Sequence, residues 1–298
     1  MIKDEFSMTD QGDTAESTPS SSLSSFDNSL LSQEKALNLY YANFHVAHSW
    51  MMSREALESL LKSSADDTRF LEATIFYIAS RYSVTDSTSY WERAYEMSQE
   101  SLPPTLWTVQ ALLSLSIASF GEENDYRSLF SQASNLALHL GLQYKVFADE
   151  QKELVQTESC RRTYWALYVY EVLLDMRNNM TCTPLYQINS TDGAELPCKE
   201  QEYEAGTIPA PISLADYDRL GASRDHSSWA YFIDLIRIHD SCVTQFPCEW
   251  AISSGELEDV NQRIDAWRNT LRAPKMERLG ENGTVDIILY SALVISYG

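Results

Sequence analysis

The stretch from Leu106 to Asn179 limits the possible folds of this chain more than any other part of the sequence. It contains two apolar segments typical of helices, and the second ends at Gly141, where a glycine commonly terminates a helix. Residues 155–177 then predict the longest helix of the chain. Because no alternating strand pattern interrupts these segments, they favour an all-α fold.

The helical pattern extends over almost all of residues 32–298. Apolar and aromatic side chains recur at three- and four-residue intervals from Leu37 to His48. After a proline-containing loop at 181–211, helices are predicted near 213 and at 226–246, 256–270 and 284–297. We therefore expect an irregular bundle of roughly ten helices. Residues 1–31 are rich in Ser and acidic residues and are predicted to be disordered.

The composition argues against several classes of function. The net charge of −21 opposes binding to a phosphate backbone, and no Lys- and Arg-rich cluster offsets it. The N-terminus has no apolar core of a signal peptide, and no run is long enough for a membrane span. An odd number of cysteines without a C-x2-C pair indicates reduced thiols in the cytosol or nucleus. They are Cys160, Cys182, Cys198, Cys242 and Cys248.

Five weak motifs in the same order resemble the regulatory, or middle homology, domain of fungal zinc-cluster transcription factors. They are an aromatic-rich opening segment at 37–51, a helical segment at 70–82, the "Leu-Gly-Leu" around Gly141 followed by Arg161-Arg162 and Tyr164-Trp165, the loop Ala194–Tyr203 with Pro197-Cys198, and a later helix with Trp267. The resemblance covers about residues 32–298 and implies an α-helical regulatory domain, which we expect to be incomplete at its C-terminal end.

The resemblance implies a nuclear transcriptional regulator, of a metabolic or secondary-metabolite gene set, with other transcription proteins as partners. It implies no catalytic residue, cofactor or metal site. The family's six-cysteine zinc module is absent from this sequence, so we expect action through protein contacts and no direct DNA binding by this chain alone. A helical interaction protein without a role in transcription is an alternative. Structural roles are expected for Gly141, Arg161, Arg162, Trp165, Pro197, Cys198 and Trp267.

The Arg161-Arg162 segment leads to specific energetic expectations. Glu158 and Arg162 are spaced for an exposed ion pair of about 0.2–0.5 kcal/mol. Arg161 is spaced for a cation–π contact with Trp165 of about 0.5–1 kcal/mol. We expect Arg162 at a solvated helix end, so that Arg162→Ala has little effect on stability. Trp165 is expected to be buried, and Trp165→Ala is expected to cost about 3–5 kcal/mol.

An enzymatic alternative comes from two acidic segments, Asp66–Phe70 and Asn124–Gln132. They resemble the Mg²⁺-binding motifs of class I terpene synthases, in which carboxylates hold the cation against a diphosphate. The second motif ends in Gln132 where a Glu is needed, and the first lacks its distal Asp. The pairs Asp66-Asp67 and Asn124-Asp125 also fit helix N-caps, which we favour.

Two further pairs have the spacing of metal ligands on a helix. His45 and His48 are three residues apart, as are His239 and Cys242. Zinc requires additional ligands, and the sequence offers none nearby. We therefore expect ordinary packing or surface roles for these side chains.

The helix expected at Thr284–Tyr297 is apolar over most of its surface. Such a helix either packs into the core or leaves an exposed apolar patch. We expect it to support self-association through Val285, Ile288, Leu289 and Ile295.

Overall fold

The computed structural model describes residues 31–120, 125–178, 192–221, 225–245, 254–271 and 286–297. All of them belong to the compact unit Leu31–Gly298. Of residues 1–31, which we predicted to be disordered, all but Leu31 lie outside the described residues. Leu31 is buried, and its N–H donates to the Tyr90 hydroxyl at 2.9 Å.

The described residues are helical almost throughout, which confirms the predicted all-α class. Extended backbone pairing among them is limited to two isolated bridges, Tyr144 with Gly193 and Leu196 with Ile212. The helices are α1 (Gln33–Leu39), the π-helical η1 (Tyr40–His45), α2 (Arg54–Ser63), α3 (Ala65–Ser80), α4 (Thr88–Ser98), α5 (Leu106–Ala118), α6 (Tyr126–Leu140), α7 (Lys145–Asp149), α8 (Leu154–Asn178), α9 (Glu200–Glu204), α10 (Leu214–Leu220), α11 (Ser228–Gln245), α12 (Ser254–Thr270) and α14 (Ile287–Tyr297).

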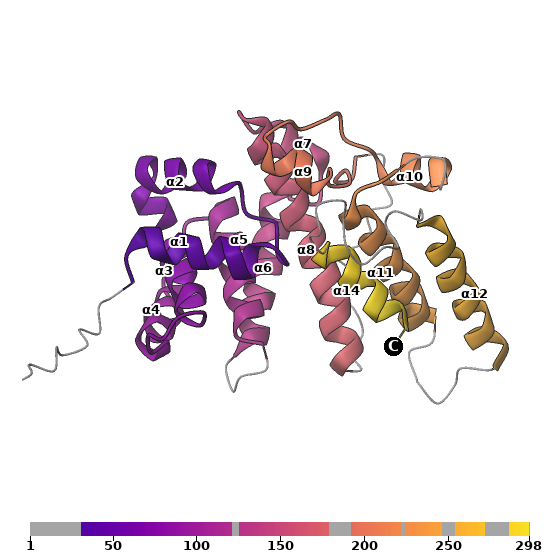
Figure 1. Ribbon diagram of the computed structural model, residues 1–298, viewed down its shortest axis with the longest axis horizontal. Coiled ribbons are helices and arrows are strands. Elements are labelled where there is room, and N and C mark those ends of the chain that lie inside the picture. Colours follow the sequence, from indigo (N-terminus) through magenta and orange to yellow (C-terminus); the bar gives the residue numbers. More distant parts are fainter. Residues whose placement is uncertain are drawn as a thin grey trace, which may run out of the picture. The chain divides into compact units, whose positions relative to one another are not determined.

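The N-terminal helices pack around α5. This helix contacts α3 and α6, while α3 also contacts α1 and α4 (Figure 1). Every side chain of α5 from Thr108 to Ser116 is buried. A helix that is buried around its whole circumference needs apolar or small residues on every face, and the sequence of α5 supplies them.

The long helix α8 joins these N-terminal helices to the C-terminal ones. It contacts α5 and α6 on one side and α11 on the other, and the short α7 also packs against it (Figure 1). All residues from Thr157 to Val169 are buried. The prediction that this is the longest helix is confirmed among the described residues, because α8 has 25 residues. Its position determines where the candidate site forms.

The C-terminal helices pack on α11, which contacts α8, α12 and α14. Ile288 and Leu289 of α14 are each only 3% exposed and belong to the core. Our expectation that these two side chains mediate self-association is therefore wrong, because they face α11 and its neighbours. Ile295 is partly buried against the same core, and Val285 lies outside the described residues. The exposed apolar side chains of α14 are Tyr290, Val294 and Tyr297.

Helix starts follow the predicted capping pattern only in part. Asp125 is the N-cap of α6, and its carboxylate accepts the Ser128 N–H at 3.2 Å, as we predicted. The cap position of α3 is instead Ser64, so Asp66 and Asp67 lie in the first helical turn. There, a negative charge still interacts favourably with the helix dipole. Asn124 lies outside the described residues.

Gly141 ends α6 in the left-handed conformation, with φ 85° and ψ 26°. Its N–H and that of Leu142 both donate to the Ala137 carbonyl, at 3.0 Å each. These bonds satisfy a carbonyl that the helix end leaves without a helical partner. The predicted role of Gly141 as a helix terminator is confirmed.

We predict that Gly141→Ala lowers the free energy of unfolding by about 1–2 kcal/mol, because a Cβ is strained in the left-handed region. The matched control is Gly255→Ala. Gly255 is on α12 without a positive φ, and an added Cβ there meets nothing within 4 Å. That change is expected to be neutral or stabilising by up to about 1 kcal/mol. Urea unfolding of both variants checks the prediction, and equal midpoints would contradict it.

Candidate functional site

A buried guanidinium, that of Arg162 on α8, lies at the meeting point of several elements. The side chain is 0% exposed. Its Nε donates to Glu158 Oε1 at 2.9 Å, one turn earlier in the same helix, and its Nη1 donates to Glu200 Oε1 on α9 at 2.7 Å. Nη2 donates to the Cys198 carbonyl at 2.8 Å. The Tyr203 ring lies against the guanidinium, with its centroid 4.1 Å from Cζ. The arginine is therefore paired on every side.

Ser49, in the turn after η1, connects this arginine to α11. Its hydroxyl accepts from Arg162 Nη1 at 3.0 Å and from the Trp229 indole at 3.1 Å. The same hydroxyl donates to Glu200 Oε1 at 2.9 Å. One small side chain thus joins α8, α9, α11 and the N-terminal helices. We call Ser49, Glu158, Arg162, Cys198, Glu200, Tyr203 and Trp229 the arginine network.

The two carboxylates keep the arginine charged. Burial by itself would lower the pKa of Arg162. The nearby charges of Glu200 and Glu158 outweigh this effect, so the pKa is raised. Glu158 is 1% exposed, and its Oε1 also accepts the Cys198 N–H at 2.8 Å. A buried ion pair is stable only when hydrogen bonds satisfy its remaining donors and acceptors, and here the loop backbone does so.

The neighbouring Arg161 and Trp165 of α8 also bind the loop that carries Cys198. Arg161 Nη2 lies 3.1 Å from Glu195 Oε2 and 3.8 Å from Asp149 Oδ1. The Trp165 indole donates to the Glu195 carbonyl at 2.8 Å. Trp165 is 5% exposed, which confirms its predicted burial. Among the described residues, Arg161 pairs with carboxylates and not with the Trp165 ring, so the expected cation–π contact is wrong.

The expected position of Arg162 at a solvated helix end is also wrong. The Glu158–Arg162 pair forms with the predicted spacing, but in the core instead of on the surface. The reason is that Thr157–Val169 of α8 is covered on all faces, so its charged residues are buried with it. Our expectation that Arg162→Ala has little effect on stability therefore no longer holds.

Five of the seven family-motif residues meet around this network. Pro197 is buried, and its carbonyl accepts the Ser227 hydroxyl at 2.6 Å. Trp267 lies apart on α12, where its indole donates to the Tyr231 carbonyl at 2.9 Å. Gly141 also lies apart, at the end of α6. Ser49 and Trp229 are network members that the sequence reasoning missed, because neither stands out by its spacing.

The profile of the fungal specific transcription factor domain matches residues 16–271. The chain belongs to this family. It is also 27% identical over 274 residues to the C6 finger domain transcription factor iacK of Pestalotiopsis fici. That match covers 89% of this chain and 40% of the relative, so the chain spans less than half of the relative's length. No solved structure matches the chain.

The network of this fungal transcription factor domain offers no reactive group. Burial raises the pKa of the Cys198 thiol well above its usual range, so the thiol stays protonated and is a poor nucleophile. No group of three or more His, Cys, Asp or Glu side chains suited to a metal occurs among the described residues. In the same part of the chain, no helix is long and apolar enough to cross a membrane. The geometry instead fits a structural junction.

His45 and His48, one of the two pairs with the spacing of metal ligands, have separate partners in the domain. His45 Nε2 lies 2.9 Å from Glu204 Oε1. His48 Nδ1 lies 2.7 Å from the Tyr170 hydroxyl. Burial lowers the pKa of His239. The side chain of Cys242 lies outside the described residues.

We predict that Arg162→Ala lowers the free energy of unfolding by about 3–5 kcal/mol, because Glu200 loses its cation and the buried Glu158 keeps only Arg161, at 3.5 Å. The matched control is Arg219→Ala. Arg219 is 71% exposed and pairs with Asp216 at 2.7 Å, so its removal is expected to cost about 0–1 kcal/mol. Chemical unfolding followed by circular dichroism measures both values. Equal effects would mean that the arginine network does not stabilise the domain.

We predict that acid destabilises the domain partly through His48. Burial, and secondarily the charge of His45, lowers the pKa of His48 from 6.5 to about 4. The unfolded chain therefore binds the proton first, and stability falls as the pH drops from 6.5 toward 4. His48→Gln is expected to flatten this part of the stability–pH profile, whereas His139→Gln, at an exposed position of α6, is not. Profiles that are identical for wild type and His48→Gln would contradict the assignment.

Proposed function

We propose that this chain is the regulatory part of a nuclear transcriptional regulator and acts through contacts with other transcription proteins. The observation that carries the proposal is membership in the fungal specific transcription factor domain family over most of the chain. We further propose a metabolic or secondary-metabolite gene set as its target, on the resemblance alone.

The charge of the chain supports action through proteins instead of direct DNA binding. The net charge is −21, and many cationic side chains are already neutralised by neighbouring carboxylates. Counterion release from DNA requires free Lys and Arg side chains. The described cations with an acidic partner within ion-pair distance are Arg54, Lys145, Arg161, Arg162, Lys199, Arg219, Arg237 and Arg268.

The cysteines support the same proposal. The relative is, by its name, a C6 finger protein. The five cysteines of this chain cannot supply six ligands to such a module, and Cys160 and Cys198 are free thiols in the helical domain. Sequence-specific contact with DNA would therefore need residues outside this chain or another protein.

We predict that the purified chain does not retard duplex DNA specifically at near-physiological salt, because its surface charge repels phosphate. Fused to an unrelated DNA-binding domain, the chain is expected to change the expression of a reporter that carries that domain's site. The DNA-binding domain alone is the first control.

A second control is the same fusion with Arg162→Ala, which is expected to lose the effect if the folded domain is needed, while the Arg219→Ala fusion keeps it. A sequence-dependent gel shift by the chain alone would contradict action through proteins. A fusion that is well expressed and folded but leaves the reporter unchanged would contradict the regulatory role.

A further inference from the structure

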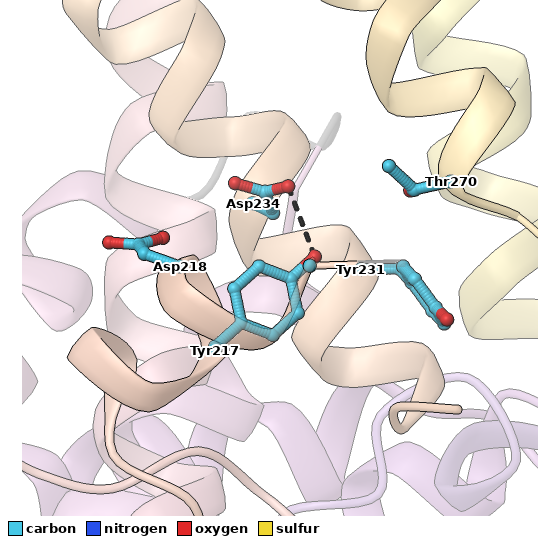
Figure 2. Close-up of a pocket in the computed structure, with 6 residues that line it drawn as sticks. Tyr217, Asp218, Tyr231, Asp234 and Thr270 are labelled. Carbon is cyan, nitrogen blue, oxygen red and sulfur yellow. Dashed lines mark hydrogen bonds between the residues drawn. The ribbon is translucent and has the colours of Figure 1, made fainter. Parts of the chain in front are cut away.

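A pocket of about 140 Å³ lies between α10, α11 and α12 (Figure 2). None of its lining residues belongs to the arginine network. The pocket is lined by Tyr217, Asp218, Gly221, Tyr231, Asp234 and Thr270. A cavity of this size is comparable to one that holds a benzene ring.

The charged residues described at the pocket give it an excess of negative charge. Arg237 donates to both oxygens of Asp218, at 2.8 and 3.1 Å, and lies 3.5 Å from Asp234 Oδ1. Two carboxylates thus share one guanidinium, which leaves one formal negative charge. Burial raises the pKa of Asp234 more than Arg237 lowers it. Among the described residues, the carboxylate of Asp234 is therefore only partly compensated, by Arg237 and by the Tyr217 hydroxyl.

The rest of the described lining is uncharged and includes two tyrosine rings. Tyr217 and Tyr231 are buried, and the Tyr217 hydroxyl donates to Asp234 Oδ2 at 3.0 Å. Figure 2 shows the two aspartates on one side, with Tyr231 and Thr270 on the side of α12. The Thr270 hydroxyl is already bonded to the Trp267 carbonyl at 2.7 Å. Gly221 contributes no side chain, and a Cβ there would meet nothing within 4 Å.

We propose that this pocket binds a small organic ammonium ion, with its charged head at Asp234 and its carbon skeleton against the tyrosine rings. A carboxylate beside aromatic rings attracts such cations both by charge and by the ring quadrupole. This site goes beyond the proposed function, because it would give the domain a small-molecule ligand whether or not it regulates transcription.

Other ligand classes fit the pocket less well. An anion would be repelled by Asp218 and Asp234. A divalent metal would need further oxygen ligands, and the described residues contain no group of three or more candidate ligands. A neutral ligand would fill the volume but would not offset the remaining negative charge beside Asp234.

The test compares amines with alcohols of the same shape on the purified chain. Benzylamine and isobutylamine are titrated against benzyl alcohol and isobutanol by ligand-observed NMR at neutral pH. We expect millimolar dissociation constants for the amines and about tenfold weaker binding of the alcohols, as is reasonable for ligands with so few atoms. Equal binding of amine and alcohol, or binding of neither, would overturn the proposal.

Two variants locate the binding. Asp234→Asn keeps the size of the side chain and is expected to weaken amine binding about tenfold, whereas Asp259→Asn, at an exposed position of α12, leaves it unchanged. Should Asp234→Asn fail to fold in a thermal melt, Asp218→Asn, with a half-exposed carboxylate, serves the same purpose. Amine binding that survives at either pocket aspartate variant would place the ligand elsewhere. Amine binding is measured without DNA or a reporter. A failure to bind amines therefore does not contradict the regulatory proposal, and a failure in the reporter assay does not contradict amine binding.

Discussion

The buried charge of Arg162 constrains the rest of the domain more than any other single group. A guanidinium removed from water loses several kcal/mol of hydration, and only close partners can replace it. Those partners come from positions far apart in the sequence, because Glu200 is 38 residues away and Ser49 is 113 residues away. The helix α8 can therefore hold its native position only when α9 and the turn after η1 are also in place.

A second, uncharged polar layer continues from the arginine network along the same helices. The Gln110 amide on α5 donates to Ser159 and Thr163 on α8, at 2.8 Å each. The same nitrogen lies 3.1 Å from the Trp50 carbonyl, so its two hydrogens are shared among three acceptors. Hydrogen bonds of this kind add little net stability compared with apolar packing, but they penalise any alternative register between α5 and α8. Together the two layers specify one arrangement of helices that apolar packing alone would leave less well determined.

The sequence predicted those features that depend on neighbouring residues. Helical periodicity predicted the helices. Gly141 predicted where α6 ends, and the apolar residues around Trp165 predicted that its side chain is buried. The burial of Arg162 could not be predicted in this way, because a charge is buried or exposed according to partners that only the fold brings near it. The same limit applies to α14, where the pattern showed an apolar helix but not which side faces α11.

For the candidate site, the resemblance located the loop with Pro197 and Cys198 but not its purpose. In the fold, that loop closes over α8 and presents its carbonyls and carboxylates to Arg161 and Arg162. The pocket between α10, α11 and α12 had no sequence signal, because its lining residues come from three helices and none forms a motif. Local pattern is therefore informative about helices, while both polar sites depend on tertiary contacts.

Hydrogen exchange of wild type and of Glu200→Gln, which keeps the shape of the side chain but removes its charge, tests the role of the arginine network most directly. We expect amides of residues 194–204 and 46–52 to exchange at least about tenfold faster in the variant, a loss of about 1.4 kcal/mol of local protection. Amides of α5 and α6 are expected to change much less. Unchanged exchange at 194–204, or an equal increase in every helix, would contradict the claim that the arginine network holds this loop on α8.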